Sequence, residues 1–88
     1  MKKNDICHVL VVINGANEEV IEVVELLNFD KQAFMEQLDV PVLTDPDMLD
    51  RYVVGPDDVE FVSTYLSKRI EFNFSTTGYW IEAIKYDT

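Results

Sequence analysis

The sequence predicts an α+β domain in which one antiparallel sheet carries two helices on one of its faces. Apolar segments rich in β-branched residues gather near both ends of the chain, and segments with helical spacing lie between them. Turn residues separate neighbouring segments. The expected order is strand, strand, helix, helix, strand, strand. The 88 residues suffice for one domain, spanning 1–88, with one modest core.

The first two expected strands form a hairpin. Residues 6–13 are almost continuously apolar and rich in Val and Ile, which is typical of a strand covered on both faces or at one edge of a tightly packed sheet. Residues 14–17 predict a turn, because Asn and Gly adopt positive φ at little cost. Residues 20–26 follow as the second strand.

A short helix is expected next, followed by a long irregular segment. Asp30 is a good N-cap for a helix that ends at Leu38. Residues 39–52 contain two prolines, and a structureless loop of this length is uncommon in a compact domain unless it has a role. Within it, Asp45 is expected to cap a single helical turn beginning at Pro46.

The second half of the chain predicts a brief extended piece, a helix and a hairpin. The extended piece covers residues 51–54, and Pro56 opens a helix that runs to about Ser67. Residues 70–74 and 79–86 alternate between apolar and polar side chains, as strands with one solvent-exposed face do. The apolar stripe expected on this helix comprises Val59, Val62, Tyr65 and Leu66.

Charge is the most informative feature of the composition. Asp and Glu number 17 against 7 Lys and Arg, so the net charge is −10. Such a surface repels nucleic acid and anionic lipid and attracts basic proteins, although acidity can also serve solubility alone. Cys7 is the one cysteine, and the chain shows neither a secretory signal nor a membrane-spanning stretch. We therefore expect a cytoplasmic protein.

No pattern of catalytic or metal-binding residues is visible. His8 and Cys7 are neighbours in a predicted strand, so their side chains point to opposite faces and cannot form a dyad. The acids from Asp45 onward depart from the calcium-loop pattern, which needs Gly where Asp50 stands and Glu where Pro56 stands. There is no glycine-rich phosphate loop. The sequence thus predicts a protein that is not an enzyme and binds no cofactor or metal.

Acidic residues concentrate in the middle of the chain. Residues 36–60 contain eight of them, opposed only by Arg51, and the segment is irregular, as binding segments often are. Tyr52 could supply an aromatic anchor or belong to the core, and Trp80 faces outward if Tyr79 and Ile81 face inward. The candidate partner-binding residues are Asp45, Asp47, Asp50, Tyr52, Asp57, Asp58, Glu60 and Trp80. Some of these acids also suit purely structural roles at helix starts.

A family resemblance rests on the same region. Asp45-Pro46-Asp47-Met48 leads to Tyr52-Val53-Val54, and then to Val59-Glu60-Phe61 and Tyr65-Leu66. This pattern, continued by Phe72-x-Phe74 and Tyr79…Glu82, resembles a small bacterial domain over roughly residues 20–83. Members of that family look like immunity proteins of polymorphic toxin systems, including contact-dependent growth inhibition. The chain departs from the pattern in having Asp47 between Pro46 and Met48.

The resemblance implies toxin neutralisation and assigns no binding residues. Together with the acidic surface, it predicts an immunity protein that binds a basic toxin domain, such as a nuclease, in the cytoplasm, with no nucleic acid or membrane as partner. The alternative is a small acidic adaptor or regulatory protein. Such a protein would bind a housekeeping partner, or would form a homodimer through an exposed edge strand that carries Trp80.

Overall fold

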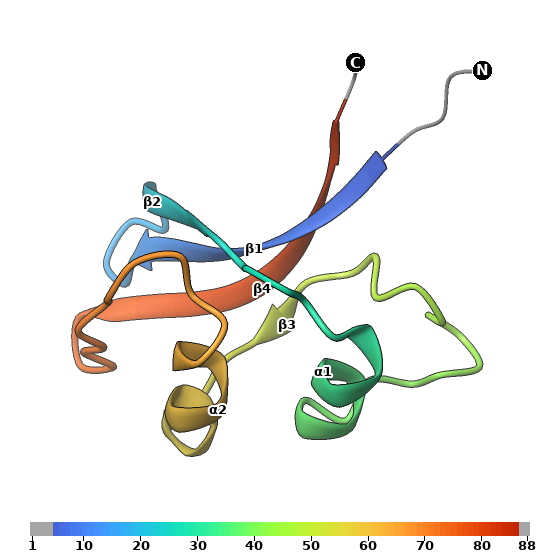
Figure 1. Cartoon of the computed structure of the whole chain (residues 1–88). Helices are drawn as coiled ribbons and strands as arrows, with labels where there is room; N and C mark the ends of the chain where they lie inside the picture. Colours follow the sequence, from blue (N-terminus) through green and yellow to red (C-terminus); the bar gives the residue numbers. More distant parts are fainter. Residues whose placement is uncertain (1–4, 87–88) are drawn as a thin grey trace.

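The computed structural model describes residues 5–86 and contains one four-stranded antiparallel sheet with two short helices (Figure 1). Both helices lie on the same side of the sheet, which confirms the predicted α+β class. The strand order in the sheet is β2-β1-β4-β3. The elements are β1 (Asp5–Asn14), β2 (Val20–Glu25), α1 (Lys31–Gln37), β3 (Tyr52–Val53), the 3₁₀ turn η1 (Pro56–Asp58), α2 (Val59–Ser63) and β4 (Thr77–Tyr86).

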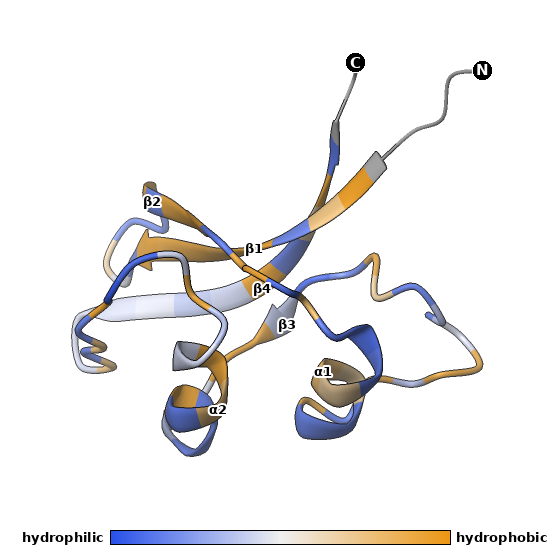
Figure 2. Ribbon diagram, viewed as in Figure 1, coloured by the Kyte–Doolittle hydropathy of each residue, from blue (hydrophilic) through white to orange (hydrophobic). Residues whose placement is uncertain are grey.

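Strand β1 lies in the centre of the sheet. It pairs with β4 from Asp5↔Tyr86 to Asn14↔Thr77 and with β2 from Val9↔Glu25 to Ile13↔Val20. The predicted first strand and first hairpin are therefore confirmed. Figure 2 shows the apolar character of β1 along much of its length.

The two faces of the sheet have different surroundings. On the inner face, Leu10 and Val12 pack with Phe34 of α1 and Val62 of α2 in the main core. On the outer face, Val9, Val11 and Ile13 form a second cluster with Trp80 and Ile84. Tyr79 and Ile81 belong to the main core, so the prediction that Trp80 points away from it is confirmed.

Helix α1 forms where the sequence predicts it. The Asp30 carboxylate accepts a hydrogen bond from the Ala33 amide at 3.1 Å, which satisfies one of the free donors of the first turn. Phe34 is fully buried and contacts the rings of Phe29, Phe61 and Tyr65. These contacts fix α1 against α2. Within residues 5–86, neither helix is long and apolar enough to cross a bilayer.

The second helix is shorter than the predicted span of residues 56–67. It begins at Pro56 as a 3₁₀ turn, and α2 ends at Ser63. The following residues bond to the end of β2: Leu27 donates to the Tyr65 carbonyl at 2.6 Å, and Ser67 donates to the Glu25 carbonyl at 2.9 Å. The helix ends where this part of the backbone bonds to Glu25, the last residue of β2, and to Leu27 just beyond it.

The predicted strand over residues 70–74 is wrong, and so is the second hairpin. The segment is irregular, and β4 pairs with β1 and with β3 instead. Phe72 and Phe74 contact the Tyr79 ring, with centroids 4.6 and 5.1 Å apart, and the Tyr79 hydroxyl accepts a hydrogen bond from the Asn73 amide. The alternating side chains of this segment therefore pack against β4 without extending the sheet.

The β1–β2 turn touches the segment before β4 at Gly15. Its amide donates to the Thr76 carbonyl at 2.9 Å, and a Cβ at Gly15 would lie 2.8 Å from that oxygen. Only glycine allows this approach of two backbones.

We predict that Gly15→Ala lowers the free energy of unfolding by about 1–3 kcal/mol, because two backbone segments must move apart. Urea unfolding measures the change. Gly55→Ala is the matched control, since a Cβ there would meet only the Asp58 carboxylate, at an ordinary 3.8 Å. Equal unfolding midpoints for the two variants would contradict the prediction.

Candidate partner-binding surface

Asp45 is buried, and its carboxylate closes the loop between α1 and β3. It accepts hydrogen bonds from the Leu49 amide at 2.8 Å, from the Asp50 amide at 3.0 Å and from the Tyr52 hydroxyl at 2.5 Å. An N-cap side chain accepts a hydrogen bond from the amide two or three residues later, whereas Asp45 accepts from amides four and five residues later. The helical turn predicted at Pro46 is therefore absent, and the chain forms non-helical turns there. Asp45 thus organises the loop from within.

A second buried contact holds the same loop. The His8 ring stacks on Phe29 with centroids 4.2 Å apart, and its Nε2 donates to the carbonyl oxygen of Met48 at 2.9 Å. Met48 is fully buried and adopts a positive φ of 54°. The long irregular segment therefore has a structural role, since it supplies a core residue that polar contacts keep in place.

The hydrogen bonds of Asp45 shift two pKa values in opposite directions. The bond from Tyr52, followed by those from the two amides, lowers the pKa of Asp45 below its ordinary value of 3.8, and burial opposes this only in part. The same bond to the Asp45 carboxylate raises the pKa of Tyr52 to about 12. The pair thus stays an anion and a neutral phenol across the physiological pH range.

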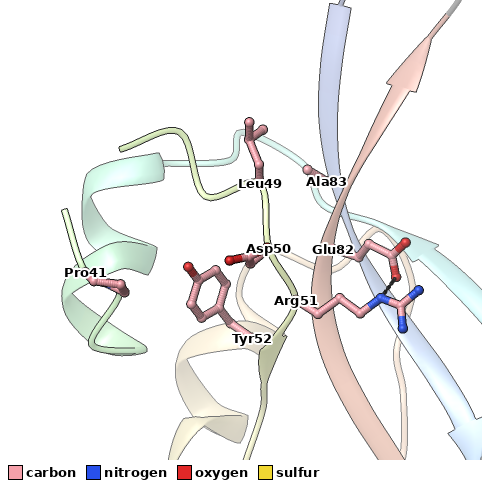
Figure 3. Close-up of a pocket in the computed structure, with 7 residues that line it drawn as sticks. All are labelled: Pro41, Leu49, Asp50, Arg51, Tyr52, Glu82 and Ala83. Atoms are coloured by element: carbon pink, nitrogen blue, oxygen red, sulfur yellow. Dashed lines mark ion pairs between the residues drawn. The ribbon is translucent and has the colours of Figure 1, made fainter. Parts of the chain in front are cut away.

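The other acids of the loop lie at its surface. Asp47 forms an ion pair with Lys31 at 3.0 Å, and both side chains are exposed. Asp50 is exposed and lines an open pocket with Pro41 and Tyr52 (Figure 3). These two carboxylates remain accessible to a partner, unlike that of Asp45.

Three predicted site residues cluster at the start of α2. We call Asp57, Asp58 and Glu60 the η1–α2 acidic group. Asp57 and Glu60 are exposed, whereas Asp58 accepts hydrogen bonds from the Gly55 amide at 2.9 Å and from the Gln37 side chain at 2.8 Å. The second bond joins the group to the last residue of α1, so two elements fix its position.

No ion pair within residues 5–86 involves the η1–α2 acidic group. The cations that form ion pairs in the structure do so elsewhere: Lys31 with Asp47, Arg51 with Glu82, and Lys68 with Glu22. The negative charge at the start of α2 is thus not neutralised by contacts within the described part of the chain.

Trp80 lies on the outer face of the sheet, the face opposite the helices. Its indole Nε1 donates to Glu82 at 2.6 Å, and the Arg51 guanidinium lies 4.8 Å from the ring centroid. Arg51 also pairs with Glu82 at 3.3 Å (Figure 3). Trp80 is on β4, between β1 and β3, and the Val53 pairing covers the edge of β4 at Trp80 itself, so the predicted exposed edge is not at this residue.

The eight candidate residues therefore do not form one surface. The η1–α2 acidic group belongs to the helical layer, Asp45 and Tyr52 support a loop, and Trp80 belongs to the opposite sheet face. Sequence reasoning missed the contribution of Arg51 and Glu82, whose cross-strand contact depends on the pairing of β3 with β4.

Metal ligands are not gathered anywhere in residues 5–86, where no three His, Cys, Asp or Glu side chains are placed to hold an ion. Comparison of the chain with protein-family models, with curated proteins and with solved structures finds no match. Function must therefore be inferred from the surfaces themselves.

We predict that one of the four tyrosines titrates near pH 12 and that Tyr52→Phe removes this step. A rapid pH jump followed by ultraviolet absorbance measures it. Since the folded pKa of Tyr52 lies above its ordinary value of 10.0, its hydrogen bond stabilises the fold below that pH and is lost as pH rises toward 12. Tyr65→Phe is the control, and loss of the step in that variant would contradict the assignment.

At low pH, the contribution of Asp45 to stability has the opposite pH dependence from that of Tyr52. Its lowered pKa stabilises the fold above pH 3.8, and this contribution disappears as pH falls through the folded value. We predict that the midpoint of thermal unfolding falls less steeply below pH 5 in Asp45→Asn than in the wild type. Asp57→Asn serves as the exposed control, and identical slopes for Asp45→Asn and the wild type would refute the prediction.

Proposed function

We propose that the chain is an immunity protein that binds a basic toxin domain through the η1–α2 acidic group and so neutralises it in the cytoplasm. The observation that carries the proposal is the absence of cationic partners around Asp57, Asp58 and Glu60 within residues 5–86. Unneutralised carboxylates on a net charge of −10 attract a positively charged macromolecule.

The fixed position of Asp58 adds to this argument. Its bonds to Gly55 and Gln37 hold the carboxylate between α1 and η1 before any partner arrives. A binding group that is already ordered loses less conformational entropy when it binds. Both oxygens of Asp58 have donors already, so the exposed carboxylates of Asp57 and Glu60 are the ones that we expect to meet partner cations.

Neutralisation, rather than binding alone, is proposed from the resemblance of roughly residues 20–83 to the immunity-protein family. A nuclease toxin must present Lys and Arg to nucleic-acid phosphates, and an acidic protein can occupy that surface in their place. Such inhibition requires tight binding. A nanomolar complex corresponds to about −12 kcal/mol, and its interface would bury roughly 1,600 Å² in total.

Asp45, Tyr52 and Trp80 take other parts in this proposal. Asp45 and Tyr52 maintain the loop that carries Asp47 and Asp50, and these two exposed acids extend the negative surface. Trp80 is not assigned to the toxin interface, because it lies on the face of the sheet opposite the helices.

The test is association with a basic toxin domain that copurifies with the chain from its native cells. We predict that Asp57→Asn combined with Glu60→Gln slows association about tenfold at low salt and that added salt abolishes the difference. Stopped-flow fluorescence measures the rate.

Glu18→Gln combined with Glu19→Gln is the matched control, because it removes the same charge from the exposed β1–β2 turn. An equal effect of both double variants would show that only net charge matters and would refute the assigned surface. Recovery of no toxin-like protein would refute neutralisation itself.

A further inference from the structure

The outer face of the sheet is apolar and has no covering layer within residues 5–86. The outward side chains of β1 are Cys7, Val9, Val11 and Ile13, and the last three are buried against Trp80 and Ile84 of the same face. A strand with one solvent-exposed face normally alternates apolar and polar residues. Both helices lie on one side of the sheet (Figure 1), so on the outer side β1 is covered by side chains of its own face, and apolar exposure remains at Val23 and Val53.

The register places apolar side chains in a row across all four strands. Val11 pairs with Val23 of β2 and with Trp80 of β4, and Trp80 pairs with Val53 of β3. Val23 and Val53 at the two ends of the row are 53% and 75% exposed. In the adjacent row, Gly78 leaves space that the Ile13 side chain fills, since a Cβ at Gly78 would lie 3.0 Å from Ile13 Cγ1.

A second row carries opposite charges at its two ends. Val9 pairs with Glu25 on one side and with Glu82 on the other, and Glu82 forms the ion pair with Arg51. The row therefore ends in Glu25 at the β2 edge and in Arg51 at the β3 edge, where the Arg51 side chain is paired with Glu82 yet 64% exposed. A two-fold axis that runs parallel to the strands, between two such faces, exchanges these edges.

The charge of the outer face also differs from that of the remaining surface. Among strand residues 6–85, the only acids directed to this face are Glu25 and Glu82, and Glu82 is neutralised by Arg51 and bonded to Trp80. The η1–α2 acidic group belongs to the opposite layer. Two copies can thus bring their outer faces together while their most acidic surfaces point away from each other.

We propose that a second copy of this chain covers the outer face, forming a two-fold homodimer in which the two sheets stack. Sheets in aligned packing lie about 10 Å apart with strands within about 30° of each other. In this arrangement Val53 of one copy meets Val23 of the other, and Arg51 meets Glu25. This inference does not depend on the proposed toxin, whose binding group stays exposed in the dimer.

Sedimentation velocity tests the dimer, with circular dichroism to confirm folding of each variant. We expect the wild type to sediment as a dimer at about 0.1 mM, well above the micromolar Kd of a modest specific interface. Val53→Lys is expected to abolish the dimer. Leu43→Lys is the control, because Leu43 is a 97% exposed apolar residue outside the sheet.

A charge exchange tests the orientation. Arg51→Glu and Glu25→Arg should each be monomeric, because each places like charges opposite one another across the axis. Mixing the two variants should restore a dimer, since each acidic end then faces a basic end. A wild-type monomer at 0.1 mM, a dimer that survives Val53→Lys, or a mixture that stays monomeric would each overturn the proposal.

Discussion

The fold depends on the central position of β1, which pairs along its whole length with β4 and through residues 9–13 with β2. Its inward side chains form the main core with α1 and α2, and its outward side chains form the second cluster around Trp80. Because the helices cover only one face, the outward side chains of β1 are buried by their neighbours on the sheet, and Val23 and Val53 remain exposed on that face. The stability of the domain therefore originates largely in β1, whereas the proposed dimer contacts are made by β2, by β3 and by Arg51.

Polar groups inside the domain serve mainly to hold the long loop before β3. Asp45 binds two amides and the Tyr52 hydroxyl, and His8 binds the Met48 carbonyl. Each buried polar side chain in residues 5–86 thus has a partner, as burial requires. This arrangement explains how a segment without regular structure contributes a fully buried Met48 to the core of a small domain.

Charge and apolar surface are separated between the two layers. The helical layer presents the η1–α2 acidic group without a cationic partner in residues 5–86, while the outer sheet face is apolar with its central charges paired. The two surfaces suit different kinds of interaction: long-range attraction of a basic protein for the first, and close packing for the second. Neither proposed interaction requires the surface that the other uses.

The sequence by itself determined the features that depend on neighbouring residues: the hairpin of residues 6–26, the Asp30 cap, and the clustering of Asp57, Asp58 and Glu60. Only the tertiary structure decided that β4 pairs with β1, that residues 70–74 pack as coil, and that Asp45 is buried and accepts a hydrogen bond from Tyr52. The reason is physical, since alternation of apolar residues records which side chains are buried but not which distant strand supplies the hydrogen bonds. An aspartate before a proline likewise suits both a helix cap and a loop anchor, and the tertiary position of Tyr52 selects between them.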